Sequence, residues 1–422
     1  MHSLSRREAL LGSLVLASAA PLRAAAAAVD PLAPVPFRID IPQARLDDIR
    51  ARLQAAHWPD EPHTPDQAKD AWRYGPPVAA MKELVGYWLN TYDWRKQEAM
   101  MNRFPHFKAN IAGQEIHFIH ERGSGKNPQP IILLHGWPSS FVVYLEVIDR
   151  LAHPERHGGK VEDAFTVVVP DLPGFGFSGK PQGPLSDATI ARALDVLMVD
   201  RLGYKGYIAQ GHDFGAGLSV KMQSESPFCK AAHINLLLGV GRPPVSDEER
   251  EAQAEWDRRV PTMHGYRMIQ SSKPLSLAYG MTDSPLAVAA WLFEKYQGWP
   301  ELAEDGDPWK VLTREQVLNE IMVYLANDTF GTASWMYITA RNAPGLPEVL
   351  PARRPALEKP VVGVAHHPGE KSMWPRSYAE RVYQLVRWND LPRGGHFPAW
   401  EQPDLYVEEM RSFSRLLKQK KL

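Results

Sequence analysis

The sequence feature that most constrains the fold is the pentapeptide Gly211-His212-Asp213-Phe214-Gly215. It follows the short apolar run 206–209 and leads directly into the small-residue stretch 216–220. Small residues on both sides of a central polar residue are typical of a buried strand that turns sharply into a helix. An ordinary helix start, with Asp213 as its N-cap, is the alternative explanation of the same pattern.

Asp213 at the centre of this turn points to a particular chemistry. A sharp strand–turn–helix of this kind presents a nucleophile, which is usually a serine that transfers acyl groups. A carboxylate in the same place attacks carbon instead, because its attack on an ester would give a reactive anhydride. The sequence therefore predicts a covalent alkyl ester on Asp213 and a substrate with an electrophilic sp3 carbon.

Apolar runs elsewhere in the chain predict the architecture around this turn. Continuous runs of the kind found in strands buried on both faces of a sheet cover residues 130–134, 165–169, 234–238 and 360–365. An alternating run covers residues 116–120, and helical patterns lie between the strands. This order predicts an α/β protein with a mostly parallel central sheet covered by helices. Residues 242–353 lack strand signals, so they predict a helical cap over the active site.

The chain divides into predicted segments of different character. These are a twin-arginine-type signal peptide (1–28), an N-terminal extension (29–125), a first core part (126–243), a helical cap (244–353) and a second core part (354–422). The signal peptide is predicted from Arg6 and Arg7, the short apolar stretch after them, and the small residues 24–28. A retained membrane anchor is the alternative, but this apolar stretch is short for a span.

This leader and the composition predict where the protein works and exclude some partners. We expect an exported protein, periplasmic or secreted, with no stable membrane anchor after signal cleavage. The net charge of −1 gives no support for binding to nucleic acid or to an anionic membrane surface. The single cysteine, Cys229, cannot form an internal disulfide, and we expect a buried structural thiol.

His396 and Glu370 are the predicted partners of Asp213. His396 lies on a glycine-framed loop after the last predicted strand, which is where an α/β-hydrolase sheet places its base. Glu370 follows the preceding predicted strand, and a carboxylate there would orient the imidazole. The competing acid position, within 236–244, contains no Asp or Glu. The resulting order of nucleophile, acid and histidine is that of the α/β-hydrolase fold.

The loop after the first buried strand, 135–138, is the predicted oxyanion loop. Backbone N–H groups of Trp137 and Phe214 are the expected donors to the oxyanion that forms when the ester is hydrolysed. We expect the Trp137-Pro138 bond to be cis, because a tight turn is the usual reason for such a bond. A plain strand-ending turn is the alternative for this loop. Residues expected to line the substrate pocket are His135, Gly136, Pro138 and His212.

Taken together, these motifs resemble those of the epoxide hydrolases of the α/β-hydrolase superfamily, in particular the microsomal-type branch. The resemblance extends from about Pro36 to Phe413. The segments that carry it are 92–97, 103–108, 116–120, 171–178 and 393–397. It implies an α/β-hydrolase fold with a helical cap, and an N-terminal meander extension like that of this branch, in an exported enzyme of bacterial type.

The resemblance also implies an acid pair in the cap. Tyr266 and Tyr337 match the two tyrosines that bind the epoxide oxygen in this family, and Tyr324 is the fallback for the second. An opened epoxide leaves an alkoxide, which is a very poor leaving group unless a phenol donates to it. The implied reaction converts a small-molecule epoxide and water to a vicinal diol. The oligomeric state stays open between a monomer and a homodimer.

No cofactor or metal ion is implied by this reaction. The histidine pairs His117/His120 and His366/His367 lack a third ligand at the spacing of a metal site. The resemblance therefore implies catalysis by protein side chains alone, in the detoxification or catabolism of an epoxide.

Two other functions fit parts of the pattern. A haloalkane dehalogenase has the same fold and an Asp nucleophile, but it needs side-chain N–H donors to halide. Phe214, where the microsomal-type branch often has Trp, supplies none, whereas Trp137 could supply one. A catalytically inactive binding protein on a hydrolase fold would have lost a catalytic residue, yet each of them is present. An esterase is disfavoured because no serine occupies the sharp turn.

Overall fold

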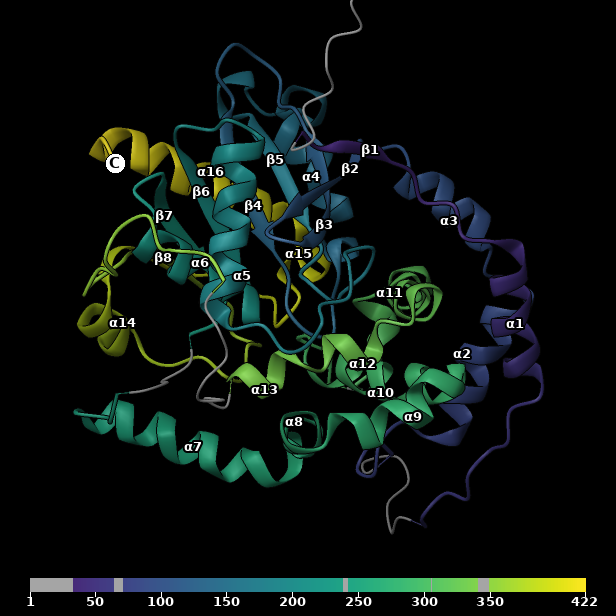
Figure 1. The fold of residues 1–422 in the computed structure, drawn as a ribbon. Helices are drawn as coiled ribbons and strands as arrows, with labels where there is room; N and C mark the ends of the chain where they lie inside the picture. The colour runs from purple at the N-terminus through teal and green to yellow at the C-terminus, as the bar shows by residue number, and fades with distance from the viewer. Residues whose placement is uncertain (1–32, 64–70, 238–241, 305, 341–348) are drawn as a thin grey trace, which may run out of the picture.

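The computed structural model describes residues 33–63, 71–237, 242–304, 306–340 and 349–422 (Figure 1). The predicted signal peptide, 1–28, lies outside these residues. Within the described ranges, no helix is both long enough and apolar enough to cross a membrane.

A nine-stranded sheet forms the centre of the molecule, in the order β1-β2-β3-β5-β4-β6-β7-β8-β9. The strands are β1 (Val35–Phe37), β2 (His106–Ile111), β3 (Gln114–Glu121), β4 (Gln129–Leu134), β5 (Phe165–Pro170), β6 (Tyr207–Gly211), β7 (Cys229–Ile234), β8 (Val361–His366) and β9 (Gln384–Asp390). Pairing is antiparallel from β1 to β5 and parallel from β5 to β9. The carboxyl ends of the parallel strands therefore meet at one edge, where such sheets carry their sites.

Helices cover the sheet, and the predicted α/β-hydrolase fold is confirmed (Figure 1). The core helices are α4 (Leu145–Ala152), α5 (Asp187–Val196), α6 (Phe214–Glu225), α14 (Arg376–Val382), α15 (Pro398–Glu401) and α16 (Pro403–Lys420). Helix α6 packs on β6 and β7 beside α5, whereas α16 packs with α4. The continuous apolar character of β4 and β5 follows from this arrangement, because Ile131–Leu134 and Phe165–Pro170 are buried throughout.

The strand predicted over 234–238 is wrong for the described residues 235–237, and residue 238 lies outside the described ranges. The strand is β7, which starts at Cys229, ends at Ile234 and pairs with β6 and β8. Leu236 and Leu237 leave the sheet but stay buried in a cluster with Trp374, whose backbone N–H donates to the Leu237 carbonyl. Their apolar character therefore reflects packing beside the sheet rather than pairing within it.

The described residues between β7 and β8 are helical and lie along the carboxyl edge of the sheet (Figure 1). The helices are α7 (Asp247–Met263), α8 (Gly265–Ser272), α9 (Pro274–Asp283), α10 (Pro285–Gly298), α11 (Arg314–Asn327), α12 (Phe330–Ala333) and α13 (Met336–Ala340). Polar residues set their starts. Ser284 caps α10 ahead of Pro285, and Thr313 with Gln316 forms a capping box on α11.

The N-terminal extension forms a collar that connects the cap helices to the sheet. Its helices are α1 (Gln43–Gln54), α2 (Val78–Asn90) and α3 (Trp94–Met101). Helix α1 packs against α10 and α11, and Arg45 donates to the Leu325 carbonyl at the end of α11. The Tyr92 hydroxyl donates to Asn319 on α11 at 2.7 Å. The collar therefore holds the cap at α10 and α11, on the side away from β7 and β8, the strands that flank the cap in the chain (Figure 1).

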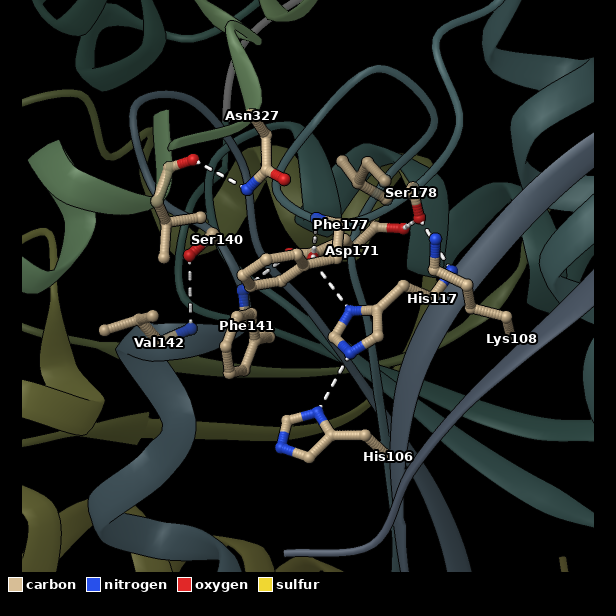
Figure 2. Close-up of polar contacts among 12 residues, drawn as sticks. His106, Lys108, His117, Ser140, Phe141, Val142, Asp171, Phe177, Ser178 and Asn327 are labelled. Atoms are coloured by element: carbon tan, nitrogen blue, oxygen red, sulfur yellow. Dashed lines mark hydrogen bonds and ion pairs between the residues drawn. The ribbon is translucent and has the colours of Figure 1, made fainter. Parts of the chain in front are cut away.

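A buried hydrogen-bond chain joins this extension to the core (Figure 2). His106 Nε2 lies 2.9 Å from the Met101 carbonyl, His106 Nδ1 lies 2.9 Å from His117 Nε2, and His117 Nδ1 lies 2.8 Å from Asp171. A carbonyl only accepts, so His106 Nε2 carries a proton. Burial lowers the pKa of His106 to about 4, which makes His106 neutral and leaves its Nδ1 as an acceptor.

His117 Nε2 therefore donates to His106 Nδ1, and His117 Nδ1 lies against the Asp171 carboxylate. Burial by itself would raise the pKa of Asp171, but the hydrogen bond and charge of His117, the charge of His135 and the Phe177 N–H together hold that pKa below its usual value. Asp171 also accepts the backbone N–H groups of Phe141 and Phe177. The carboxylate is thus fully partnered, and the chain fixes β2 and β3 to the loop after β5.

This network predicts a specific loss of stability in acid. Unfolded His106 takes up a proton near pH 6.5, whereas folded His106 resists protonation until about pH 4. Its contribution is therefore complete above pH 6.5 and is lost as the pH falls toward 4. We expect His106→Gln to reduce the pH dependence of the unfolding free energy across this window by up to ~1.4 kcal/mol per pH unit.

Urea denaturation at several pH values measures this effect. The exposed His57 supplies a control, since His57→Gln should leave the slope unchanged. An H106Q protein with the wild-type slope would contradict the assignment of His106 as a neutral buried acceptor.

Candidate active site

Asp213 occupies the turn between β6 and α6 in a strained conformation. Its backbone has φ 50° and ψ −129°, a conformation that costs a non-glycine residue about 1–3 kcal/mol. The turn is also too tight for a side chain at Gly215, where a Cβ would collide with the Leu134 carbonyl at the end of β4. The glycine framing in the sequence is therefore a packing requirement, and an ordinary helix start does not account for it.

Two backbone N–H groups meet the Asp213 carboxylate. Trp137 N–H donates to Oδ1 at 2.9 Å, and the Phe214 N–H, at the start of α6, also favours the ionised carboxylate. The predicted cis bond between Trp137 and Pro138 is confirmed. Burial raises the pKa of Asp213, while His396 and these two N–H groups act in the opposite direction by favouring the carboxylate. The same donors lie where negative charge on this carboxyl group would be stabilised.

His396 and Glu370 lie together beside this carboxylate. His396 Nε2 is 3.7 Å from Asp213 Oδ2, and His396 Nδ1 is 2.7 Å from Glu370 Oε2. Burial would lower the pKa of His396, but the charge and hydrogen bond of Glu370, together with the charges of Asp213 and Glu401, raise that pKa. Among the described residues, Nε2 has no hydrogen-bond partner, so the nitrogen that faces Asp213 is free to take up a proton.

The two predicted cap tyrosines lie in the same cavity as this group. Tyr266 on α8 and Tyr337 on α13 have ring centroids 5.6 Å apart, and the ring of Tyr337 lies 4.9 Å from that of Phe214. Burial raises the pKa of both phenols, which keeps them protonated as donors at neutral pH. Tyr324, the fallback, packs against Phe175 and is absent from the described cavity lining.

The cavity that these groups share has a volume of about 520 Å³. Its walls combine aromatic and aliphatic side chains with a smaller number of charged ones. Its lining includes Asp213, Glu370, His396, Tyr266, Tyr337, Phe214, Trp256, His264 and Trp299. A cavity of this size and character suits a small, mainly apolar molecule.

Four residues expected in the pocket are placed behind it instead. The described lining of the cavity does not include His135, Gly136, Pro138 or His212. His135 Nε2 accepts the Leu172 N–H, His212 Nδ1 bonds the Tyr144 hydroxyl, and the Pro138 carbonyl accepts from Tyr296. The hydrogen bonds of these residues hold the loop 135–138 and the ends of the strands in place. The residues therefore support the nucleophile from behind the cavity wall.

Two residues near the acid pair are not predicted from the sequence. Trp299 lies between acid and base, with ring centroids 5.5 Å from Tyr266 and 4.8 Å from His396. Lys295, only 2% exposed, places its ammonium 4.4 Å from the centre of the Tyr266 ring. The available signal was the position of Lys295, three residues after Leu292 on the buried face of α10.

Comparison with known proteins places this fold and cavity in a family. Residues 129–259 match the model described as "alpha/beta hydrolase fold", and residues 34–144 match "Epoxide hydrolase N terminus". The chain is 30% identical to "Epoxide hydrolase 1" of Sus scrofa over 414 residues, which cover 91% of this chain and 89% of that protein. The class is thus that of the α/β-hydrolases. Within that class, the chain belongs to the epoxide hydrolase family.

Other relatives agree with this placement. A Stigmatella aurantiaca protein, provisionally named as an epoxide hydrolase, is 39% identical over 394 residues, covering 91% of this chain and 86% of the relative. The structure of Aspergillus niger epoxide hydrolase superposes with a TM-score of 0.76 at 28% identity, covering 92% of this chain and 96% of that one. The protein is therefore an enzyme of the epoxide hydrolase type.

The tight packing behind the nucleophile gives a testable prediction. A Cβ at Gly136 would collide with the Asp213 carboxyl group, so Gly136→Ala must displace either the loop or the nucleophile. We expect turnover of an epoxide to fall by on the order of 100-fold. Gly86→Ala in α2 is the control, because its Cβ would meet no atom within 4 Å. Wild-type kcat in G136A would contradict the described approach of the loop to Asp213.

Proposed function

We propose that the enzyme converts an epoxide and water to a vicinal diol through a covalent ester on Asp213. The observation that carries this proposal is the joint placement of a nucleophile, a base and two acids at one cavity. A carboxylate on a strained turn faces an imidazole at 3.7 Å, and two protonated phenols extend from the cap. Nucleophile, base and acid are the groups that a two-step opening of an epoxide requires.

In the first step, an Asp213 carboxylate oxygen attacks an epoxide carbon. A new C–O ester bond forms while the C–O bond of the epoxide breaks and its electrons move to the ring oxygen. Tyr266 and Tyr337 hydrogen-bond this oxygen, and one of them gives it a proton. The ammonium of Lys295, paired with Glu294, packs over the face of the Tyr266 ring and helps to hold it in place.

In the second step, His396 takes a proton from water, and the water oxygen attacks the carbonyl carbon of the ester. Glu370 orients His396 and stabilises the imidazolium. Backbone N–H groups of Trp137 and Phe214 bind the tetrahedral oxyanion. The bond between the carbonyl carbon and the alkyl oxygen then breaks, and the alkyl oxygen takes the proton from His396, which releases the diol. The second proton of the water passes from the Asp213 carboxyl group to the tyrosinate of the first step, and the water oxygen remains on Asp213.

Replacement of the base separates the two steps. In His396→Gln, Asp213 still attacks the epoxide, but water is not activated, so the ester accumulates. We expect intact-protein and peptide mass spectrometry to find one substrate adduct on Asp213 after mixing with styrene oxide or an aliphatic epoxide. The double variant Asp213→Asn/His396→Gln should show none. An adduct elsewhere, or diol without Asp213 as the attachment site, would contradict the mechanism.

The acid pair can be tested against a matched tyrosine. Tyr266→Phe and Tyr337→Phe each remove a donor to the epoxide oxygen, and we expect each to slow ester formation by about 100-fold. Tyr324→Phe removes a buried phenol that lies outside the cavity and should leave that rate unchanged. Rapid-quench measurement of the adduct gives these rates. A slow Y324F beside an unaffected Y337F would reverse the assignment of the second tyrosine.

A further inference from the structure

A buried carboxylate supports the loop that carries His396, and no step of the proposed reaction uses it. Glu401, at the end of α15, is 8% exposed. Its Oε1 accepts the N–H of Phe397 at 2.7 Å, and its Oε2 accepts the N–H of Gly395 at 2.8 Å. These two residues flank His396 in the chain. One side chain therefore fixes the backbone on both sides of the base.

The same carboxylate also reaches the cap. Glu401 Oε2 accepts the N–H of Glu301 at 2.8 Å, just after α10 ends. The His396 N–H donates to the Trp299 carbonyl at 3.2 Å. Gly395 permits this approach, because a Cβ there would lie 2.5 Å from the Glu301 nitrogen. The base loop and this cap segment are thus packed backbone to backbone around Glu401.

We propose that Glu401 is a positioning residue for the second half-reaction. It sets His396 over the ester by accepting hydrogen bonds from the backbone on both sides of His396 and from the cap segment 299–301. This inference rests on the proposed function. Its effect falls on hydrolysis because the first step uses Asp213 and the tyrosines, whereas only the second step needs His396 in register with the carbonyl carbon.

The chemistry of the three donors explains why a carboxylate is needed here. A carboxylate presents acceptors on both oxygens and no donor, whereas an amide replaces one acceptor with an NH₂ group. In Glu401→Gln, that NH₂ would face at least one backbone N–H, so the loop or the cap segment must shift. Burial raises the pKa of Glu401 to about 7, while the three N–H groups and the charge of His396 act in the opposite direction. The test is therefore run above about pH 8, where the carboxylate form predominates.

The test separates the two half-reactions in Glu401→Gln. Rapid-quench experiments with an epoxide follow the formation and decay of the Asp213 ester by peptide mass spectrometry. We expect ester formation within about threefold of wild type and ester hydrolysis slower by on the order of 10–100-fold. The ester should therefore accumulate in E401Q and not in wild type. Equal slowing of both steps, or wild-type hydrolysis, would overturn the proposal.

Glu409 provides a matched control for the loss of a buried carboxylate. It is 3% exposed, and it accepts from Arg387 and Asn389 on β9, away from the base loop. Glu409→Gln should lower the melting temperature without changing the ratio of the two rates. A changed ratio in E409Q would overturn the proposal, because it would show that any buried charge loss near the C-terminus has this effect.

Two further measurements distinguish the proposal from misfolding of the variant and from failure of the proposed function. If E401Q does not fold, Glu401→Asp keeps the charge but shortens the reach, and slow ester hydrolysis with normal ester formation supports the proposal. Wild-type hydrolysis in E401D would then overturn it. Failure of the proposed function looks different, because neither wild-type enzyme nor His396→Gln would then form an ester on Asp213.

Discussion

The active site depends on the strained backbone conformation of Asp213. A residue with a side chain is held at φ 50° between β6 and α6, and the neighbouring packing supplies the energy. Gly215 lets α6 approach the end of β4, and Gly136 leaves room for the carboxyl group. The result is a carboxylate lifted above the sheet edge, in reach of backbone N–H groups from two loops. Every other group in the site is placed relative to it.

The acid pair and the base come from different layers of the structure, so they are aligned only when the cap packs correctly on the core. Tyr266 and Tyr337 belong to the cap, whereas His396 follows β9 of the core. The N-terminal collar holds the cap helices, and the His106–His117–Asp171 chain fixes β2 and β3 to the loop after β5. Glu401 joins cap to base loop directly. Buried polar groups therefore fix the relative positions of the layers, while the burial of apolar side chains supplies most of the stability.

The sequence predicts the parts of this site that follow local rules. A central Asp between glycines, the order of Glu370 and His396, and the turn at Trp137-Pro138 each follow from chain geometry near strand ends. Glu401 acts through contacts that close only when cap and core meet, so no local pattern marks it. Lys295 lies on the buried face of α10, but its contact with Tyr266 joins two cap helices whose packing no local pattern gives. The strand misplaced at 234–238 shows the same limit, since apolar residues beside a sheet resemble those within it.

The central claim is that the second oxygen of the diol, the one that the epoxide does not supply, comes from the Asp213 carboxyl group. An oxygen from water then replaces it on Asp213. A single turnover of wild-type enzyme in excess over a hydrolysable epoxide, run in heavy-oxygen water, tests it directly. We expect one heavy oxygen in the Asp213 carboxyl group and none in the diol of the first turnover. Heavy oxygen in the first diol, with an unlabelled Asp213, would show direct attack by water and would contradict the account.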